Sequence, residues 1–224
     1  MGNSGKTAAI AIVTLVVGLV VGFGAAKAMD DEMNGGHDMA SMTKTSDKAS
    51  DLRANLVTLG VEHMTYTDQA VAAALDGAPN AEQLAELLYD NGDQIGAAVG
   101  SFYGDEAEKT FDQVWKLHLD QFVNYAVASS KGDEAAKQAA LDKIDSGYTK
   151  PLAQFLAKAN PNFDEQTLET ALRDHVNMTA KMIDFHVDGN YQKEADELNM
   201  ANKHIEGIMS VLAAGIVKQF PDKF

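Results

Sequence analysis

Residues 52–73 read LRANLVTLGVEHMTYTDQAVAA, and this stretch decides the fold. Its apolar and aromatic residues recur at alternating intervals of four and three, which places them on one face of an α-helix. The face comprises Leu52, Leu56, Leu59, His63, Tyr66, Ala70 and Ala73. A stripe of this length needs other helices to cover it. The stretch therefore predicts one helix of a bundle, with His63 in the middle of its core-facing side.

Further segments with the same period follow, separated by short breaks rich in Gly, Pro, Asn and Asp. Pro151 should kink or divide one of these helices near Gly147. Gly92, Gly96 and Gly100 recur every fourth residue and predict a closely packed neighbouring helix. Short connections favour antiparallel neighbours, so we predict an all-α, up-and-down bundle of about six helices over residues 51–224. After the first helix, the others are expected over about 81–99, 106–129, 133–158, 164–187 and 191–218.

The sequence also carries an internal echo at an offset of 57 residues. It aligns Leu84 with Leu141 and His118 with His175, and most of its other matches pair one apolar residue with another. This pattern suggests that a helical hairpin was duplicated. The alternative is that two helices of the same period match by chance.

The charge and the composition exclude several classes of function. The chain of 224 residues has 33 acidic and 18 basic residues, for a formal charge of −15. Such a surface repels nucleic acid, so we expect no nucleic-acid partner. The chain has no cysteine. This excludes disulfides, thiolate zinc sites, cysteine nucleophiles and covalently attached c-type haem.

The N-terminus predicts export from the cytoplasm. Residues 7–26 are uncharged and mostly apolar, which is long enough for a transmembrane helix. Lys6 precedes this run and acids follow it, so the body of the protein should be extracytoplasmic. Residues 1–28 are either a membrane anchor or a signal peptide, and cleavage after Ala28 would release a secreted protein. The spacing Gly18-x-x-x-Gly22 is compatible with a homodimer formed through this helix.

Residues 29–50 form a polar segment that we expect to be a disordered linker. The segment contains methionines and a histidine, and their soft thioether and imidazole groups suit copper, especially Cu(I). The alternative is a solvated tether in which these residues are incidental. The residues concerned are Met29, Met33, His37, Met39 and Met42.

Four histidines lie on the apolar faces of four predicted helices: His63, His118, His175 and His204. Two of them share the pattern acid-His-x-x-x-Thr, and the other two share His-apolar-acid-x-apolar. Imidazoles bind zinc, copper, iron and nickel, and bundle cores often hold such sites. We therefore predict that the four converge on a metal. The alternative is that each is a core residue hydrogen-bonded to a carboxylate or a backbone carbonyl.

Acidic residues near these histidines are the other candidates for the site. Glu197 lies seven residues before His204 on the same stripe, which makes it a possible direct ligand. Acids one or two residues from a histidine flank the stripe, where they are possible partners that orient imidazoles of neighbouring helices. These are Glu62, Asp120, Asp174 and Glu206. His186, near the end of its helix, is expected to be a capping or surface residue.

The predicted function is the binding or sequestration of a transition metal, with copper favoured over iron or zinc. The sequence has no Glu-x-x-His motif of di-iron bundles, no His-Glu-x-x-His motif and no assignable catalytic residue. Two alternatives remain open. One is a non-catalytic envelope protein with a structural or protein-interaction role and no metal, and the other is a metal-dependent oxidoreductase.

Six segments resemble a family of bacterial all-helical proteins that carry histidines on their helix faces. They are the His63 helix, residues 95–104, the His118 helix, the Ala-Asn-Pro-Asn run at 159–162, the string His175-x-x-x-Thr179 and the ending GIVKQFPDKF at 215–224, which is the most specific of them. The resemblance spans roughly residues 52–224 and implies an all-α domain over that range. It implies no activity, because none is established for that family.

Overall fold

The computed structural model describes residues 47–224, and every regular element in that range is helical. The described part therefore confirms the all-α prediction. Counting α4, η2 and α5 as one interrupted helix, it contains six helices, as predicted. The elements are α1 (Lys48–Asp76), α2 (Ala81–Tyr103), α3 (Asp105–Lys131), α4 (Glu134–Ile144), η2 (Asp145–Thr149), α5 (Lys150–Ala159), α6 (Glu165–Val187), α7 (Tyr191–Gln219) and η3 (Pro221–Lys223).

Capping residues fix where the helices begin and end. The side chain of Asp47 accepts a hydrogen bond from the Ser50 amide at 2.8 Å at the start of α1. Such a cap stabilises a helix by about 1 kcal/mol. At the other end of α1, Gly77 has φ of 66° and closes the helix in the left-handed conformation. The helix thus ends within the Asp-Gly-Ala-Pro-Asn break at 76–80, where the sequence predicts a turn.

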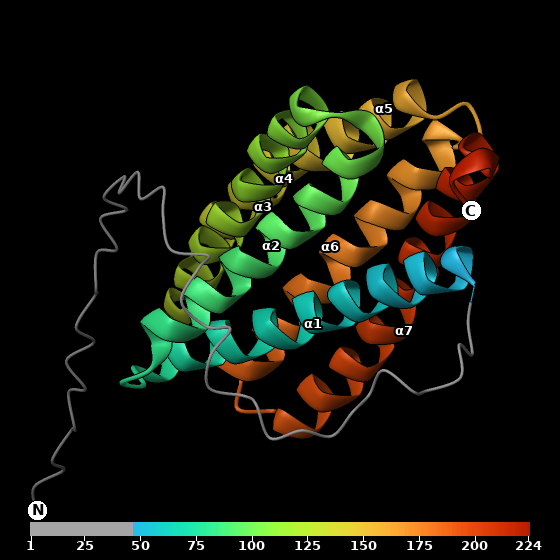
Figure 1. The fold of residues 1–224 in the computed structure, drawn as a ribbon. Coiled ribbons are helices and arrows are strands. Elements are labelled where there is room, and N and C mark those ends of the chain that lie inside the picture. The colour runs from blue at the N-terminus through green and yellow to red at the C-terminus, as the bar shows by residue number, and fades with distance from the viewer. Residues whose placement is uncertain (1–46) are drawn as a thin grey trace, which may run out of the picture. The chain divides into compact units, whose positions relative to one another are not determined.

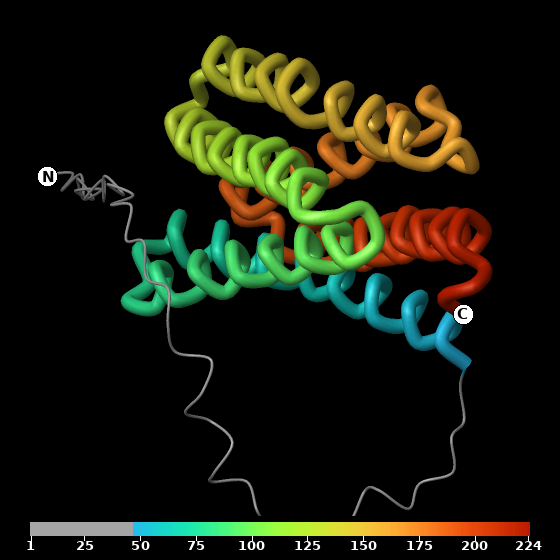
Figure 2. Tube along the Cα trace, turned by 45° about the horizontal axis from the view of Figure 1, so that its top comes forward, coloured from blue at the N-terminus to red at the C-terminus, as the bar shows by residue number. Residues whose placement is uncertain are grey.

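With α4, η2 and α5 taken as one helix, each helix reverses direction and packs against the next one in the chain (Figure 1). The last helix, α7, packs against both α6 and α1 and so closes the ring of helices. Figure 2 shows α3 and the α4–α5 segment on one side of the bundle and α1, α2 and α7 on the other. Three helices that are not neighbours in the chain, α1, α3 and α6, also contact one another across the interior. These three carry His63, His118 and His175.

The glycines of α2 face α3, as the sequence predicts. A Cβ atom added at Gly92 would lie 2.5 Å from Nε1 of Trp115, and one at Gly100 would meet Glu108. At Gly92 a side chain would clash with the Trp115 ring, so glycine there lets the two helices approach closely, whereas at Gly100 the flexible Glu108 side chain could move aside. One consequence is that the Nε1–Cδ1 edge of the Trp115 indole lies against the α2 backbone at Gly92.

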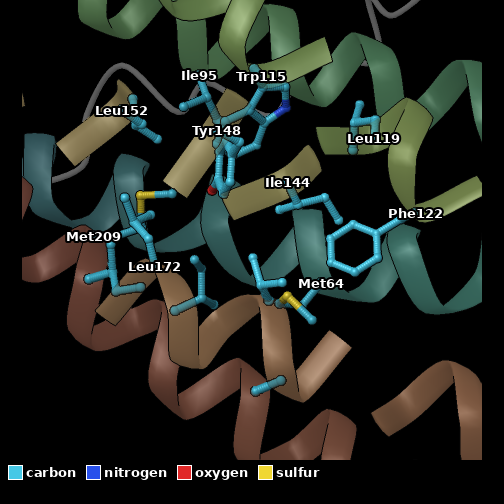
Figure 3. Close-up of a cluster of buried hydrophobic side chains, with 14 of the residues drawn as sticks. Met64, Ile95, Trp115, Leu119, Phe122, Ile144, Tyr148, Leu152, Leu172 and Met209 are labelled. Carbon is cyan, nitrogen blue, oxygen red and sulfur yellow. The ribbon is translucent and has the colours of Figure 1, made fainter. Parts of the chain in front are cut away.

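The predicted division of the fourth helix near Gly147 is confirmed as a π-helical segment, η2. Pro151 has no N–H to bond the carbonyl of Gly147, and its ring would clash with that carbonyl in a regular helix. The chain widens instead, and the Lys150 amide bonds the Asp145 carbonyl five residues earlier. The wide turn directs Tyr148 into the core, where it is 1% exposed and lies beside Trp115 (Figure 3).

The predicted anchor or signal peptide at 1–28 lies outside the described residues, as does the predicted linker up to residue 46. The helix α1 begins at Lys48, three residues before the predicted domain boundary at 51. No helix within residues 47–224 is long and apolar enough to cross a membrane.

Candidate metal centre

Three of the four predicted histidines converge in the core. His63 on α1, His118 on α3 and His175 on α6 are each 1% exposed or less. One ring nitrogen from each lies within 4.8 Å of the corresponding nitrogens of the other two. The ring centroids are 5.7 Å apart for His63 and His118, 5.8 Å for His63 and His175, and 6.4 Å for His118 and His175. We call these residues the histidine cluster.

Five of the six ring nitrogens of the cluster are buried without a hydrogen-bond partner. Both ring nitrogens of His118 and of His175, and Nδ1 of His63, are buried without one. Leaving a buried polar atom unpaired costs about 1–3 kcal/mol, and most buried polar atoms in proteins are therefore paired. A cation coordinated by one nitrogen of each ring would satisfy three of these atoms at once. The unpaired nitrogens thus point to a ligand that binds lone pairs.

The spacing of the three nitrogens fits a metal ion after a small adjustment. Three atoms separated by at most 4.8 Å all lie within about 2.8 Å of a common point, which is 4.8 Å divided by the square root of three. Metal–imidazole bonds are about 2.0–2.1 Å long. Each nitrogen would have to move inward by at most roughly 0.7 Å. Small rotations of the three side chains suffice for that movement.

Burial keeps the rings of the cluster neutral. It lowers the pKa of His63 to about 3, with a further contribution from His175. The pKa of His175 falls to about 4, first through burial and then through His204. Burial, followed by the two neighbouring imidazoles, lowers the pKa of His118 well below its ordinary value. The backbone carbonyl of Trp115 acts in the opposite direction, although its position relative to the ring does not meet the geometry of a hydrogen bond. At neutral pH each ring therefore offers an unprotonated nitrogen to a metal.

Aromatic side chains surround the cluster. Trp115 lies 4.8 Å from His63 and 4.7 Å from His118, measured between ring centroids. Tyr148 stacks on His118 at 4.2 Å with an interplanar angle of 22°. Burial raises the pKa of Tyr148, so its phenol stays neutral. Within residues 47–224 the cluster thus has aromatic neighbours and no carboxylate close enough to be a ligand.

The repeated acid-His-x-x-x-Thr pattern reflects a shared local arrangement. Thr67 donates a hydrogen bond to the His63 carbonyl at 2.7 Å, and Thr179 donates one to the His175 carbonyl at 3.0 Å. Each hydroxyl is thereby satisfied within its own helix, one turn after the histidine. The same pattern therefore lets a buried threonine pack beside the histidine on both α1 and α6.

His204 and Glu197 do not join the cluster. Nε2 of His204 lies 2.8 Å from the carbonyl oxygen of Ala171, so this half-buried ring is engaged with the α6 backbone. Glu197 is buried on α7, with a carboxylate oxygen 4.0 Å from the Lys181 ammonium. The predicted four-histidine set with a carboxylate ligand is corrected to three histidines, because α7 packs with these two side chains directed elsewhere.

The four flanking acids do not orient the imidazoles of the cluster. Asp120 accepts a hydrogen bond from the Tyr89 hydroxyl at 2.7 Å, Asp174 and Glu206 are exposed, and Glu62 is half-buried. Within residues 47–224, no Asp or Glu lies close enough to the three histidines to count as a ligand. The predicted role fails because these acids face solvent or, as with Asp120 and Tyr89, another partner.

His186, predicted to be a capping or surface residue, is instead buried in a second polar group. Its Nδ1 lies 2.8 Å from Glu194 and its Nε2 lies 3.3 Å from Asp76. Burial lowers the pKa of His186, but these carboxylates outweigh it and the net shift is upward. Burial and then Glu194 raise the pKa of Asp68 to about 6. The short turn at 188–190, which folds Glu194 back onto α6, is the sequence signal for this contact.

The chain matches no known protein family, no curated protein and no solved structure. The resemblance to bacterial helical proteins therefore stays a prediction. The chemistry of the histidine cluster is the remaining guide to function.

Proposed function

We propose that the protein binds one transition metal ion through His63, His118 and His175, and that it stores or sequesters this ion. The observation that carries the proposal is the convergence of three buried, neutral imidazoles, five of whose six ring nitrogens lack partners. Storage is favoured over catalysis because each ligand is 1% exposed or less. A catalytic metal needs an open coordination position that substrate can reach.

The proposal is tested by titrating the metal-free protein with Cu(I), Zn(II), Co(II) and Fe(II) under anaerobic conditions. Trp115 is the one tryptophan of the chain and lies 4.8 Å from His63, so its fluorescence reports binding directly. Because the site is closed, long incubation is needed at each step. We expect a fluorescence change that saturates at one ion per chain for at least one of these metals.

Matched variants distinguish the cluster from other histidines. His175→Gln should abolish the fluorescence change and the bound metal, as measured by elemental analysis after dialysis. His204→Gln should retain both, because that ring bonds the Ala171 carbonyl outside the cluster. Unchanged stoichiometry in His175→Gln, or no metal bound by the wild type, would contradict the proposal.

We also propose that residues 7–26 tether the protein to the membrane with its helical domain on the extracytoplasmic side. The support is the uncharged run of 20 residues between Lys6 and the acids at 30–32. Protease added to intact spheroplasts should degrade the helical domain of the membrane-bound full-length chain. Recovery of an intact, full-length chain in the soluble cytoplasmic fraction would refute the tether.

A duplicated helical hairpin is the final part of the proposal. Shifting α3 (Asp105–Lys131) by 57 residues gives 162–188, which closely matches α6 (Glu165–Val187). The same shift moves α2 onto 138–160, the range of α4, η2 and α5. The cluster residues His118 and His175 correspond under this shift. Duplication would explain how two helices came to present a histidine at equivalent positions. An experimental structure in which the two hairpins superpose with these histidines out of register would contradict it.

A further inference from the structure

The identity of the ion follows from the charge of the ligands, and this inference rests on the proposed function. The histidine cluster supplies three neutral donors. Within the described residues no carboxylate belongs to the group, and the chain has no cysteine. Nothing in the coordination sphere therefore offsets the charge of a bound ion. The net charge buried in the core on binding equals the charge of the ion itself.

The surroundings make that charge expensive to bury. Trp115 and Tyr148 line the cluster, and His118 itself is 0% exposed. The cost of moving an ion from water into such an environment scales with the square of its charge. A divalent ion of similar size thus meets about four times the penalty of a monovalent one. Natural zinc sites in protein interiors commonly reduce this cost with thiolate or carboxylate ligands, which are not found in this cluster.

The number of donors points in the same direction. Zn(II) takes four ligands in structural sites, and the cluster offers three nitrogens with no fourth side-chain ligand among the described residues. Cu(II) favours tetragonal surroundings, which three converging imidazoles do not provide. Cu(I) is monovalent, accepts three nitrogen donors in a plane and has no need of a bound water.

We propose that the histidine cluster selects copper in the Cu(I) state, as a three-coordinate ion, over divalent metals. The probe for this selectivity is Ag(I), which has the same charge, resists redox change and accepts few ligands. Ag(I) and Cu(I) should each bind one-to-one, compete with each other and change the Trp115 fluorescence. Zn(II) and Co(II) should fail to displace Ag(I) at a hundredfold excess. Protein loaded with Cu(I) should remain silent in electron paramagnetic resonance after exposure to air.

A charge-altering variant tests the electrostatic reason for the selectivity. His175→Asp places an anionic ligand in the cluster and should lower the preference for Ag(I) over Zn(II) by at least tenfold. Met200→Asp adds the same charge to an exposed position of α7 outside the cluster and should leave the preference unchanged. Equal effects of the two variants would overturn the inference.

The outcomes separate this inference from the proposed function. If Zn(II) or Co(II) binds one-to-one, requires His175 and is not displaced by Ag(I), the protein is a metal-binding protein but the Cu(I) inference is wrong. If neither monovalent nor divalent ions bind, the proposed function fails and the inference fails with it. Selective, His175-dependent binding of Ag(I) and Cu(I) supports both.

Discussion

Replacing His118 by leucine should stabilise the metal-free protein, although it removes a ligand. The two nitrogens of this ring are buried without partners, at a cost of about 1–3 kcal/mol each. Leucine has a similar volume and no polar atom. It loses the ring contacts with Tyr148 and Trp115, which are worth about 0.5–1.5 kcal/mol each, and it packs less well than a ring. The expected net gain is about 1–3 kcal/mol.

Urea unfolding followed by circular dichroism at 222 nm, with a chelator present at neutral pH, measures this change in the free energy of unfolding. The matched control is His204→Leu, which loses a hydrogen bond to the Ala171 carbonyl and should be destabilised by about 0.5–1.5 kcal/mol. The two substitutions therefore have opposite expected signs. Destabilisation of His118→Leu by more than about 1 kcal/mol would refute the reasoning, because it would show that the His118 nitrogens are already paired in the metal-free protein.

Three further predictions concern pH, packing and metal. The free energy of unfolding of the metal-free protein should fall by about 3 kcal/mol per pH unit between roughly pH 6 and 4. In this range the three cluster imidazoles are protonated in the unfolded chain but stay neutral in the folded protein, which destabilises the fold as the pH falls. Asp68, whose folded pKa is raised to about 6, binds a proton in the folded protein and so cancels the contribution of one histidine. Urea unfolding at stepped pH checks this, and stability that rises on acidification would contradict it. Gly92→Ala should displace Trp115, shift its fluorescence and cost about 1–3 kcal/mol, whereas Gly207→Ala, whose added methyl meets nothing, should not destabilise. Metal at a thousandfold excess over Kd should raise the free energy of unfolding of the wild type by about 4 kcal/mol. The same metal should leave the free energy of unfolding of His118→Leu unchanged. Equal gains in both proteins would place the metal elsewhere.

The helices could be predicted because their causes are local. The stripe around His63, the turn at Gly77 and the interruption caused by Pro151 depend on residues that are close in the sequence. The close approach of α2 and α3 also follows from one local feature, the glycines at every fourth position. These features therefore give correct helix positions and a correct packing face before any tertiary contact is known.

Membership of the site could be predicted only in part, because periodicity gives the face of a helix and not its rotation against its neighbours. His175 and His204 lie on equally apolar stripes, yet one ring reaches the cluster and the other reaches the Ala171 carbonyl. The difference arises from the way α7 packs between α1 and α6. The contact between His186 and Asp76 was missed for the same reason, since 110 residues separate them in the chain.

The central claim is that one metal ion is held by His63, His118 and His175. The most direct measurement is a crystal structure of the copper-loaded protein, with anomalous diffraction collected at the copper absorption edge. The claim predicts one strong anomalous peak in the core, about 2.0–2.1 Å from one ring nitrogen of each histidine. A core without a peak, with copper instead at His186 or at surface carboxylates, would contradict it.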